Sequence, residues 1–149
     1  MATKGKVQVD AMNTMGYDAM SLGSGDFIIG LDNLRDRMDM AQFPILSANV
    51  VLSDTGALIA EPYATFELTA KHRVAVIGLT DPDVIGFMQV TGGPALQVLD
   101  GVETVRYYVD EVGGAADIII VLSHMGLEYD EMLAEQISQI DVIIGGKTQ

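Results

Sequence analysis

The stretch DIIIVLSHMG at residues 117–126 decides the fold class, because an aliphatic run there ends abruptly in a polar loop. A second stretch, DVIIGGKTQ at residues 141–149, repeats this order, and a third run, VAVIGL at residues 74–79, has the same character. Consecutive aliphatic residues are typical of strands that are covered on both faces, as in parallel sheets. These runs predict parallel strands in an α/β domain.

Helices are predicted where apolar residues recur every three or four positions, which occurs at residues 6–15, 31–38, 102–112 and 127–140. Shorter apolar runs predict further strands at residues 17–22, 45–52, 58–60 and 65–68. The alternation of strands and helices predicts one α/β domain over residues 1–149, with a mostly parallel sheet flanked by helices. The short strands at 58–60 and 65–68 are expected to be antiparallel.

Composition excludes several classes of function. The chain has 149 residues, a net charge of −13 and only eight Lys and Arg residues, so nucleic acid is not an expected partner. It has no cysteine, which excludes disulfides and thiolate metal sites. No apolar run reaches the ~18 residues of a membrane span. The first residues, MATKGK, precede no apolar run, so no signal peptide is expected.

Four loops are predicted to meet at one end of the sheet. Ligands of open α/β sheets bind beyond the carboxyl ends of the strands. The loops that should lie there are residues 23–27, 80–83, 123–126 and 145–149. The sequence therefore places its candidate functional residues in these four loops.

The motifs in and between these loops resemble those of one protein family. They are DAMNTMGYDAM (10–20), GSGDF (23–27), FPILSANV (43–50), RVAVIGLT (73–80), SHMG (123–126) and GGKTQ (145–149). Their order resembles the calcineurin-like metallophosphoesterases, in the branch of bacterial 5'-nucleotidases and UDP-sugar hydrolases. That family's motifs include GNHEF, FPxLSANV, KVAVIGLT, SHxG and GGHTH. The resemblance implies a layered metallophosphoesterase-like fold, a two-metal centre, phosphoester hydrolysis and, often, a location outside the cytoplasm.

The residues at the working positions of these motifs differ from the family pattern. The asparagine ligand and the acid histidine of GNHEF, and both GGHTH histidines, are replaced by Ser24, Gly25, Lys147 and Gln149. Asp26 matches the acidic position, which in the family supports the loop. A lysine ammonium has no lone pair to give a metal, and glycine cannot act as an acid. His124 is thus the one matching metal ligand, and no catalytic residue is expected.

The resemblance also implies missing parts. Three parts of the family fold have no counterpart in these residues. They are the first strand, which carries an Asp-x-His motif, the aspartate that bridges the two metals, and the C-terminal sheet. We therefore expect an incomplete domain, without a cofactor and without catalysis, that acts as a structural or interaction module. The expected partner is a second copy of the chain or another chain that completes the sheet. The alternative is a phosphoester hydrolase that uses Mn, Zn or Mg and takes its missing ligands from another chain or segment.

Two residues, His124 and Lys147, each have two interpretations, and His72 has one. His124 is either a surviving metal ligand, assisted by Asp26, or a histidine that is hydrogen-bonded locally at a strand end. Lys147 either binds a phosphate as a point charge or neutralises the acidic loops around it. His72 precedes a strand and is expected to be a solvated turn residue.

Overall fold

The computed structural model describes residues 4–147. Its helices are α1 (Lys6–Met15), α2 (Leu31–Met40), α3 (Val84–Thr91), α4 (Gly101–Val112) and α5 (Leu127–Gln136), and a 3-10 turn, η1, spans Ser24–Phe27. Its strands are β1 (Met20–Ser21), β2 (Ile45–Leu46), β3 (Val50–Leu52), β4 (Tyr63–Thr69), β5 (His72–Leu79), β6 (Leu96–Val98), β7 (Ile118–Ser123) and β8 (Val142–Gly145).

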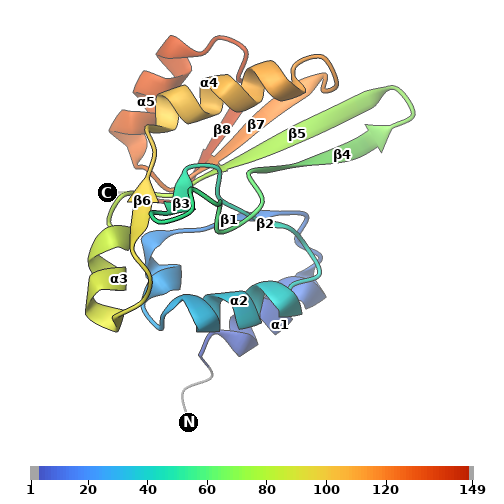
Figure 1. Cartoon of the computed structure of the whole chain (residues 1–149). Helices are drawn as coiled ribbons and strands as arrows, with labels where there is room; N and C mark the ends of the chain where they lie inside the picture. The colour runs from blue at the N-terminus through green and yellow to red at the C-terminus, as the bar shows by residue number, and fades with distance from the viewer. Residues whose placement is uncertain (1–3, 148–149) are drawn as a thin grey trace.

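The largest sheet has the strand order β4-β5-β7-β8, in which β5, β7 and β8 are parallel and β4 is antiparallel to β5. Two smaller pairs accompany it, β1 with β2 in parallel and β3 with β6 in antiparallel orientation. Helices α4 and α5 lie on one side of the large sheet, and the β1–β2 pair with α1 and α2 lies on the other (Figure 1). The predicted α/β class with parallel central strands is confirmed.

Helix α4 shows how the sequence produces this layering. The Asp100 carboxylate accepts a hydrogen bond from the Glu103 backbone N–H at 2.9 Å and so caps the first turn. Val105 and Val109 lie on one stripe of the helix and are buried against the sheet. Burying each such side chain contributes about 1.5–3 kcal/mol relative to exposure.

Gly78 allows the two layers to approach closely. A Cβ atom on Gly78 would lie 2.7 Å from the backbone of Leu46, in strand β2 of the other layer. Backbone cannot yield as a flexible side chain can, so this position of β5 excludes any larger residue. The contact fixes where β2 crosses the large sheet.

One predicted strand is in fact two. Residues 45–52 were expected to form a single strand, but β2 pairs with β1 and β3 pairs with β6, in different sheets. Between them, Asn49 pairs with the backbone of Thr80 through two hydrogen bonds of 2.8 and 2.9 Å, and the Ser47 hydroxyl lies 2.8 Å from the Thr80 hydroxyl. These long-range bonds replace the strand ladder and redirect the chain.

Several boundaries also differ from the predictions. Residues 58–60 form no strand and contribute only an isolated bridge, Leu58 with Val51. The strand at residues 17–22 shortens to β1, and the last helix ends at Gln136, before Ile140. The prediction missed α3 and β6, because the apolar residues of α3 lie all around a short helix and give no stripe. His72 begins β5 and is exposed, so it is solvated as expected but is not a turn residue.

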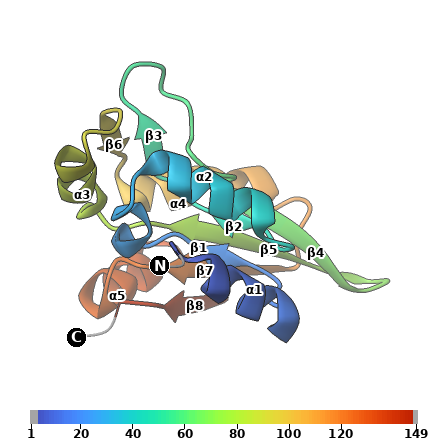
Figure 2. The same cartoon turned by 90° about the horizontal axis from the view of Figure 1, so that it is seen from below.

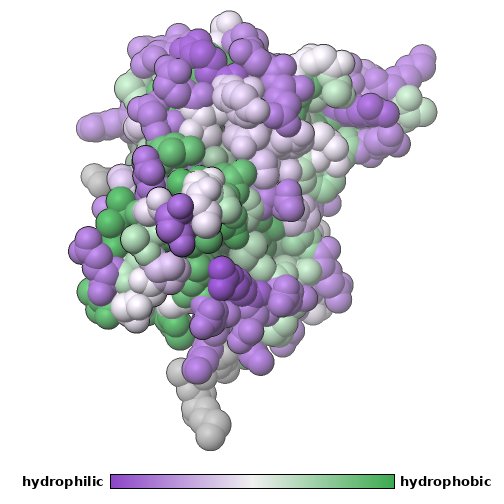
Figure 3. Space-filling model, viewed as in Figure 1, coloured by the Kyte–Doolittle hydropathy of each residue, from purple (hydrophilic) through white to green (hydrophobic). Residues whose placement is uncertain are grey.

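The surface follows the same layers. The outer sides of α2 and α4 are mostly hydrophilic, while apolar residues gather between them around β3, β6 and α3 (Figure 3). Strand β8 forms one edge of the large sheet and β4 the other, and the view from below shows β8 beyond β7 (Figure 2). Within residues 4–147, every helix is too short or too polar to cross a membrane.

Candidate functional site at the carboxyl end of the sheet

Asp81 is the centre at which the four predicted loops meet. It lies just beyond the end of β5 and is fully buried. Its Oδ2 accepts hydrogen bonds from the Ser24 backbone N–H at 3.1 Å and from His124 Nδ1 at 2.8 Å. Its Oδ1 accepts from the Asp83 backbone N–H at 3.0 Å and from Lys147 Nζ at 3.4 Å. The expected convergence of these loops is therefore confirmed for the residues up to Lys147.

The environment of Asp81 keeps it ionised. Burial alone would raise the pKa of the Asp81 carboxyl, but the hydrogen bonds from His124, Ser24 and Asp83 and the charge of Lys147 outweigh burial and hold the pKa below its ordinary value. A buried carboxylate with four donors has little capacity left for another ligand. The cluster is thus internally satisfied.

His124 is oriented by this carboxylate. An ionised Asp81 can only accept, so Nδ1 of His124 carries the hydrogen in their 2.8 Å contact. The other ring nitrogen, Nε2, faces the loop before η1, where a Cβ on Gly23 would lie only 2.7 Å from it. The absence of a side chain at Gly23 is what admits the imidazole. This geometry suits a locally hydrogen-bonded histidine, and it also leaves Nε2 without a hydrogen, as in a metal ligand, so it does not separate the two interpretations of His124.

Lys147 neutralises the acidic loop. Its Nζ lies 2.8 Å from Asp83 Oδ2 and 3.4 Å from Asp81 Oδ1. The hydrogen bond with Asp83 raises the pKa of Lys147 above its ordinary value; partial burial opposes this rise, and the charge of Asp81 adds to it. The ammonium is therefore paired with two carboxylates, as the second interpretation of Lys147 expected. Gln149 lies outside the described residues.

The three other motif positions lie in η1. Ser24 is buried, whereas Gly25 is exposed and a side chain there would meet no atom within 4 Å. Asp26 accepts a hydrogen bond from the Gly23 backbone N–H at 3.0 Å and forms an ion pair with Arg37 at 3.1 Å. Arg37 also donates to the backbone carbonyl of Asp26. Asp26 thus supports the loop, and its carboxylate is engaged by the loop backbone and by α2.

A second buried carboxylate fixes the SHMG loop. Asp130, in the first turn of α5, accepts a hydrogen bond from the Ser123 hydroxyl at 2.5 Å, and Ser123 Oγ accepts from the Met125 backbone N–H at 3.1 Å. A Cβ on Gly145 would lie 2.7 Å from Asp130 Oδ2. Ser123 is therefore a structural hydroxyl that holds the loop after β7 against α5.

Comparison with known proteins places this arrangement in a family. No family model matches the chain. A snake venom 5'-nucleotidase of Gloydius brevicauda is 34% identical over 97% of the chain and 25% of its own length. The 5'-nucleotidase precursor of Thermus thermophilus superposes with a TM-score of 0.82 at 33% identity, covering 97% of this chain and 29% of that one. The calcineurin-like phosphoesterase YfkN of Bacillus subtilis superposes with a TM-score of 0.85 at 31% identity. The match covers 93% of this chain and 47% of that one.

The chain is a homologue of the calcineurin-like metallophosphoesterases. It spans about a quarter of the length of the snake venom relative, as the 25% coverage shows. The resemblance read from the motifs is confirmed, and the fold agrees with the layered metallophosphoesterase-like fold expected from it.

The metal centre implied by this homology does not fit the residues around Asp81. A lysine ammonium lies 3.4 Å from the buried carboxylate at the centre of the loops and would repel a divalent cation. His124 donates through Nδ1 and so offers a metal only Nε2, and Asp26 is paired with Arg37. Within the described range, no three His, Cys, Asp or Glu side chains are grouped so that they could hold a metal ion. A catalytic metal usually needs about three protein ligands.

The role of Asp81 was missed by the sequence-based reasoning, although its loop was placed at the correct end of the sheet. The motifs drew attention to His124 and Lys147, whose common partner was not identified. A signal did exist, because Asp81 is the first charged residue after the aliphatic run 74–79. A carboxylate in that position lies at the same edge as the loops after β7 and β8.

Proposed function

We propose that this metallophosphoesterase-like domain is catalytically inactive and acts as a structural or interaction module. The observation that carries the proposal is the closed hydrogen-bonded cluster of Asp81, His124 and Lys147. In it an ammonium supplies the positive charge that a metal would otherwise bring, and the carboxylate is satisfied by the chain's own donors. Two-metal hydrolysis requires ions that activate a water and clamp both oxygens of the displacement.

The proposal includes a partner. A second copy of this chain, or another chain that completes the sheet, would bury apolar surface that the described residues leave uncovered. Open sheet edges and contiguous apolar patches are features through which proteins in general associate.

The alternative function is phosphoester hydrolysis that depends on Mn, Zn or Mg, with the missing ligands supplied by another chain or segment. The observation that favours it is homology to proteins named 5'-nucleotidases, such as the snake venom relative, of which this chain spans only about a quarter. In that case a supplied carboxylate or histidine would have to displace Lys147 from Asp81.

Metal analysis joined to an activity assay separates the two functions. Under our proposal, purified protein dialysed against Mn²⁺, Zn²⁺ or Mg²⁺ retains no stoichiometric metal, and hydrolysis of a generic phosphomonoester stays at background. Tight binding of about one or two ions per chain, with turnover that a chelator abolishes, would establish the hydrolase instead. The matched control is the Lys147→Met variant, which removes the ammonium and keeps a long apolar stem.

A further inference from the structure

The ammonium of Lys147 lies where two carboxylates of the loop after β5 converge. Its Nζ is 2.8 Å from Asp83 Oδ2 and 3.4 Å from Asp81 Oδ1. The Asp83 backbone N–H donates to Asp81 Oδ1 at 3.0 Å, and this bond fixes the short turn that holds the two side chains together. Proteins hold Mg²⁺ through one or two carboxylates of this kind. Here the cation between the carboxylates is the chain's own lysine.

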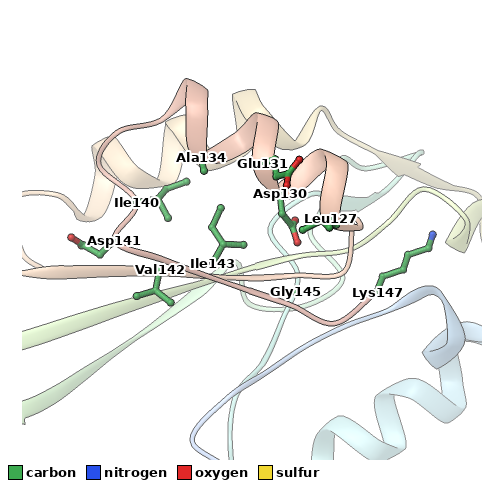
Figure 4. A pocket seen from close by; sticks show the side chains of 10 residues that line it. All are labelled: Leu127, Asp130, Glu131, Ala134, Ile140, Asp141, Val142, Ile143, Gly145 and Lys147. Atoms are coloured by element: carbon green, nitrogen blue, oxygen red, sulfur yellow. The ribbon is translucent and has the colours of Figure 1, made fainter. Parts of the chain in front are cut away.

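Lys147 reaches this point from a different strand. It follows β8, whereas Asp81 and Asp83 follow β5, and β7 lies between these two strands in the sheet. Figure 4 shows Gly145 at the end of the strand and Lys147 beyond it, with the lysine side chain extending away from the strand. His124, which follows β7, donates to the other oxygen of Asp81 at 2.8 Å. The three parallel strands are thus tied together at their carboxyl ends through one carboxylate.

Burial makes a positive charge necessary beside Asp81. Its side chain is fully buried, and a buried carboxylate is tolerated as an anion only when a cation and hydrogen-bond donors compensate it. The side chain of Lys147 is 30% exposed and that of Asp83 is 64% exposed. The ammonium therefore lies at the boundary between the buried carboxylate and solvent, and a free ion that approached Asp81 Oδ1 would have to displace it.

The two carboxylates do not belong to the metal centre that the motifs imply. The motif RVAVIGLT ends at Thr80, so Asp81 and Asp83 follow it and stand at none of the ligand positions described above. Lys147 does stand at one of those positions, but its side chain binds this other pair of groups. The replacement of a histidine by lysine thus joins a motif position to a carboxylate pair outside the motifs.

We propose that Lys147 is the covalently attached cation of an Asp81–Asp83 site, and that it excludes the divalent cations that these two carboxylates would otherwise bind. This inference rests on the proposed function and explains how the module assembles its carboxyl end without a metal. A tethered ammonium is present beside the carboxylates whatever the concentration of free ions. Without it, the two carboxylates would repel each other and would take up Mg²⁺ or Ca²⁺, which prefer oxygen ligands and complete their shell with water.

Thermal unfolding with and without divalent ions tests this role. The Lys147→Met variant removes the ammonium and keeps an apolar stem. In the presence of a chelator, its melting temperature should be about 2–4 °C below that of the unmodified protein. Millimolar Mg²⁺ or Ca²⁺ should restore most of this difference, whereas Na⁺ at the same ionic strength should not. The unmodified protein already has its cation, so its melting temperature should change less than that of the variant.

Three further variants separate this site from general effects of charge on an acidic chain. Lys71→Met makes the same charge change at an exposed lysine in the turn between β4 and β5, and should respond to divalent ions no more than the unmodified protein. Lys147→Arg keeps the positive charge and should respond as little. Adding Asp83→Asn to Lys147→Met should remove the response, because Asp83 supplies one of the two carboxylates.

Three results would overturn the role of Lys147. The first is a response of the unmodified protein to divalent ions as large as that of Lys147→Met. The second is the lack of any response in Lys147→Met, and the third is a response that Asp83→Asn leaves intact. Hydrolysis of a phosphomonoester that a chelator abolishes would instead refute the proposed inactivity, whatever the melting temperatures, so the two failures are distinguishable.

Discussion

The carboxyl end of the large sheet and its β8 edge differ in how completely their groups are satisfied. At the carboxyl end, both oxygens of the buried Asp81 accept hydrogen bonds from within the chain, and Lys147 balances the charge. At the β8 edge, Val142 and Ile144 remain about half exposed, and a hollow lies on each face of the sheet beside the strand. The polar end is closed and the apolar edge is open.

The difference bears on where a partner would bind under the proposed function. Metallophosphoesterases bind their metals at the carboxyl ends of these strands, as the motif resemblance implied. Here that end is occupied by the chain's own donors, so a ligand would have to break four contacts to Asp81. The β8 edge offers apolar area without such a cost, since burial there stabilises by about 25 cal/mol per Å².

Removing the buried carboxylate of Asp81 should lower the free energy of unfolding more than any other substitution considered. The Asp81→Ala variant leaves the backbone N–H groups of Ser24 and Asp83 without their acceptor and removes one partner from both His124 and Lys147. We expect the free energy of unfolding to fall by about 3–5 kcal/mol, as when a buried ion pair loses one partner. Urea unfolding followed by circular dichroism measures this.

Asp83→Ala is the matched control, because it removes an exposed partner of the same lysine. The side chain of Asp83 is 64% exposed, so its loss should cost about 1 kcal/mol or less. Equal losses in the two variants would mean that the cluster is not centred on Asp81.

Lowering the pH should gradually remove the contribution of the ionised Asp81 carboxylate to the free energy of unfolding. The pKa of Asp81 is lowered in the folded chain from an ordinary value of 3.8. Its stabilisation is therefore complete above that value and is lost as the pH falls through the lowered pKa. We expect Asp81→Asn to be less stable than the unmodified protein at about pH 6, and the gap to narrow below about pH 4. Urea titrations across this range test the expectation, which a constant or widening gap would contradict.

The smallest change in the free energy of unfolding is expected for a substitution in the edge strand β8. In a single chain, Ile144→Ala removes a side chain that is 54% exposed, so at high dilution the free energy of unfolding should change by only about 0.5 kcal/mol. Ile119→Ala, on the face that α4 and α5 cover, should cost about 2–5 kcal/mol, since Ile119 is 5% exposed. If the two substitutions cost the same, β8 is covered in the single chain.

Local pattern was sufficient for much of the architecture. The aliphatic runs identified β5, β7 and β8, and the apolar periodicity identified α1, α2 and α4, because covering a strand on both faces or a helix on one stripe leaves a repeat in the sequence. The helix predicted at residues 6–15 has these bounds in the structure, and Gly16, with a φ of 72°, caps its end. The meeting of the loops at the carboxyl edge then followed from the general rule for parallel sheets.

The failures lie where contacts between distant residues decide the conformation. The run at residues 45–52 reads as one strand, yet Asn49 and Ser47 bind Thr80, about thirty residues further along the chain, and break the run in two. Short α3 packs against β6 and η1, yet its apolar residues lie nearly all around the helix, so its sequence shows no stripe. Neither arrangement leaves a periodic signal in the sequence.

The sequence by itself determined the α/β class, the four loops that meet at the carboxyl end, and the substitution of Lys147 at a motif position. Only the tertiary structure decided that Asp81 joins those loops and that β8 lies between two hollows. The physical reason is the separation along the chain over which each kind of interaction acts. Periodicity and turn chemistry act over a few residues, whereas Asp81 meets Ser24 across 57 residues and Lys147 across 66, and such pairings exist only once the layers have packed.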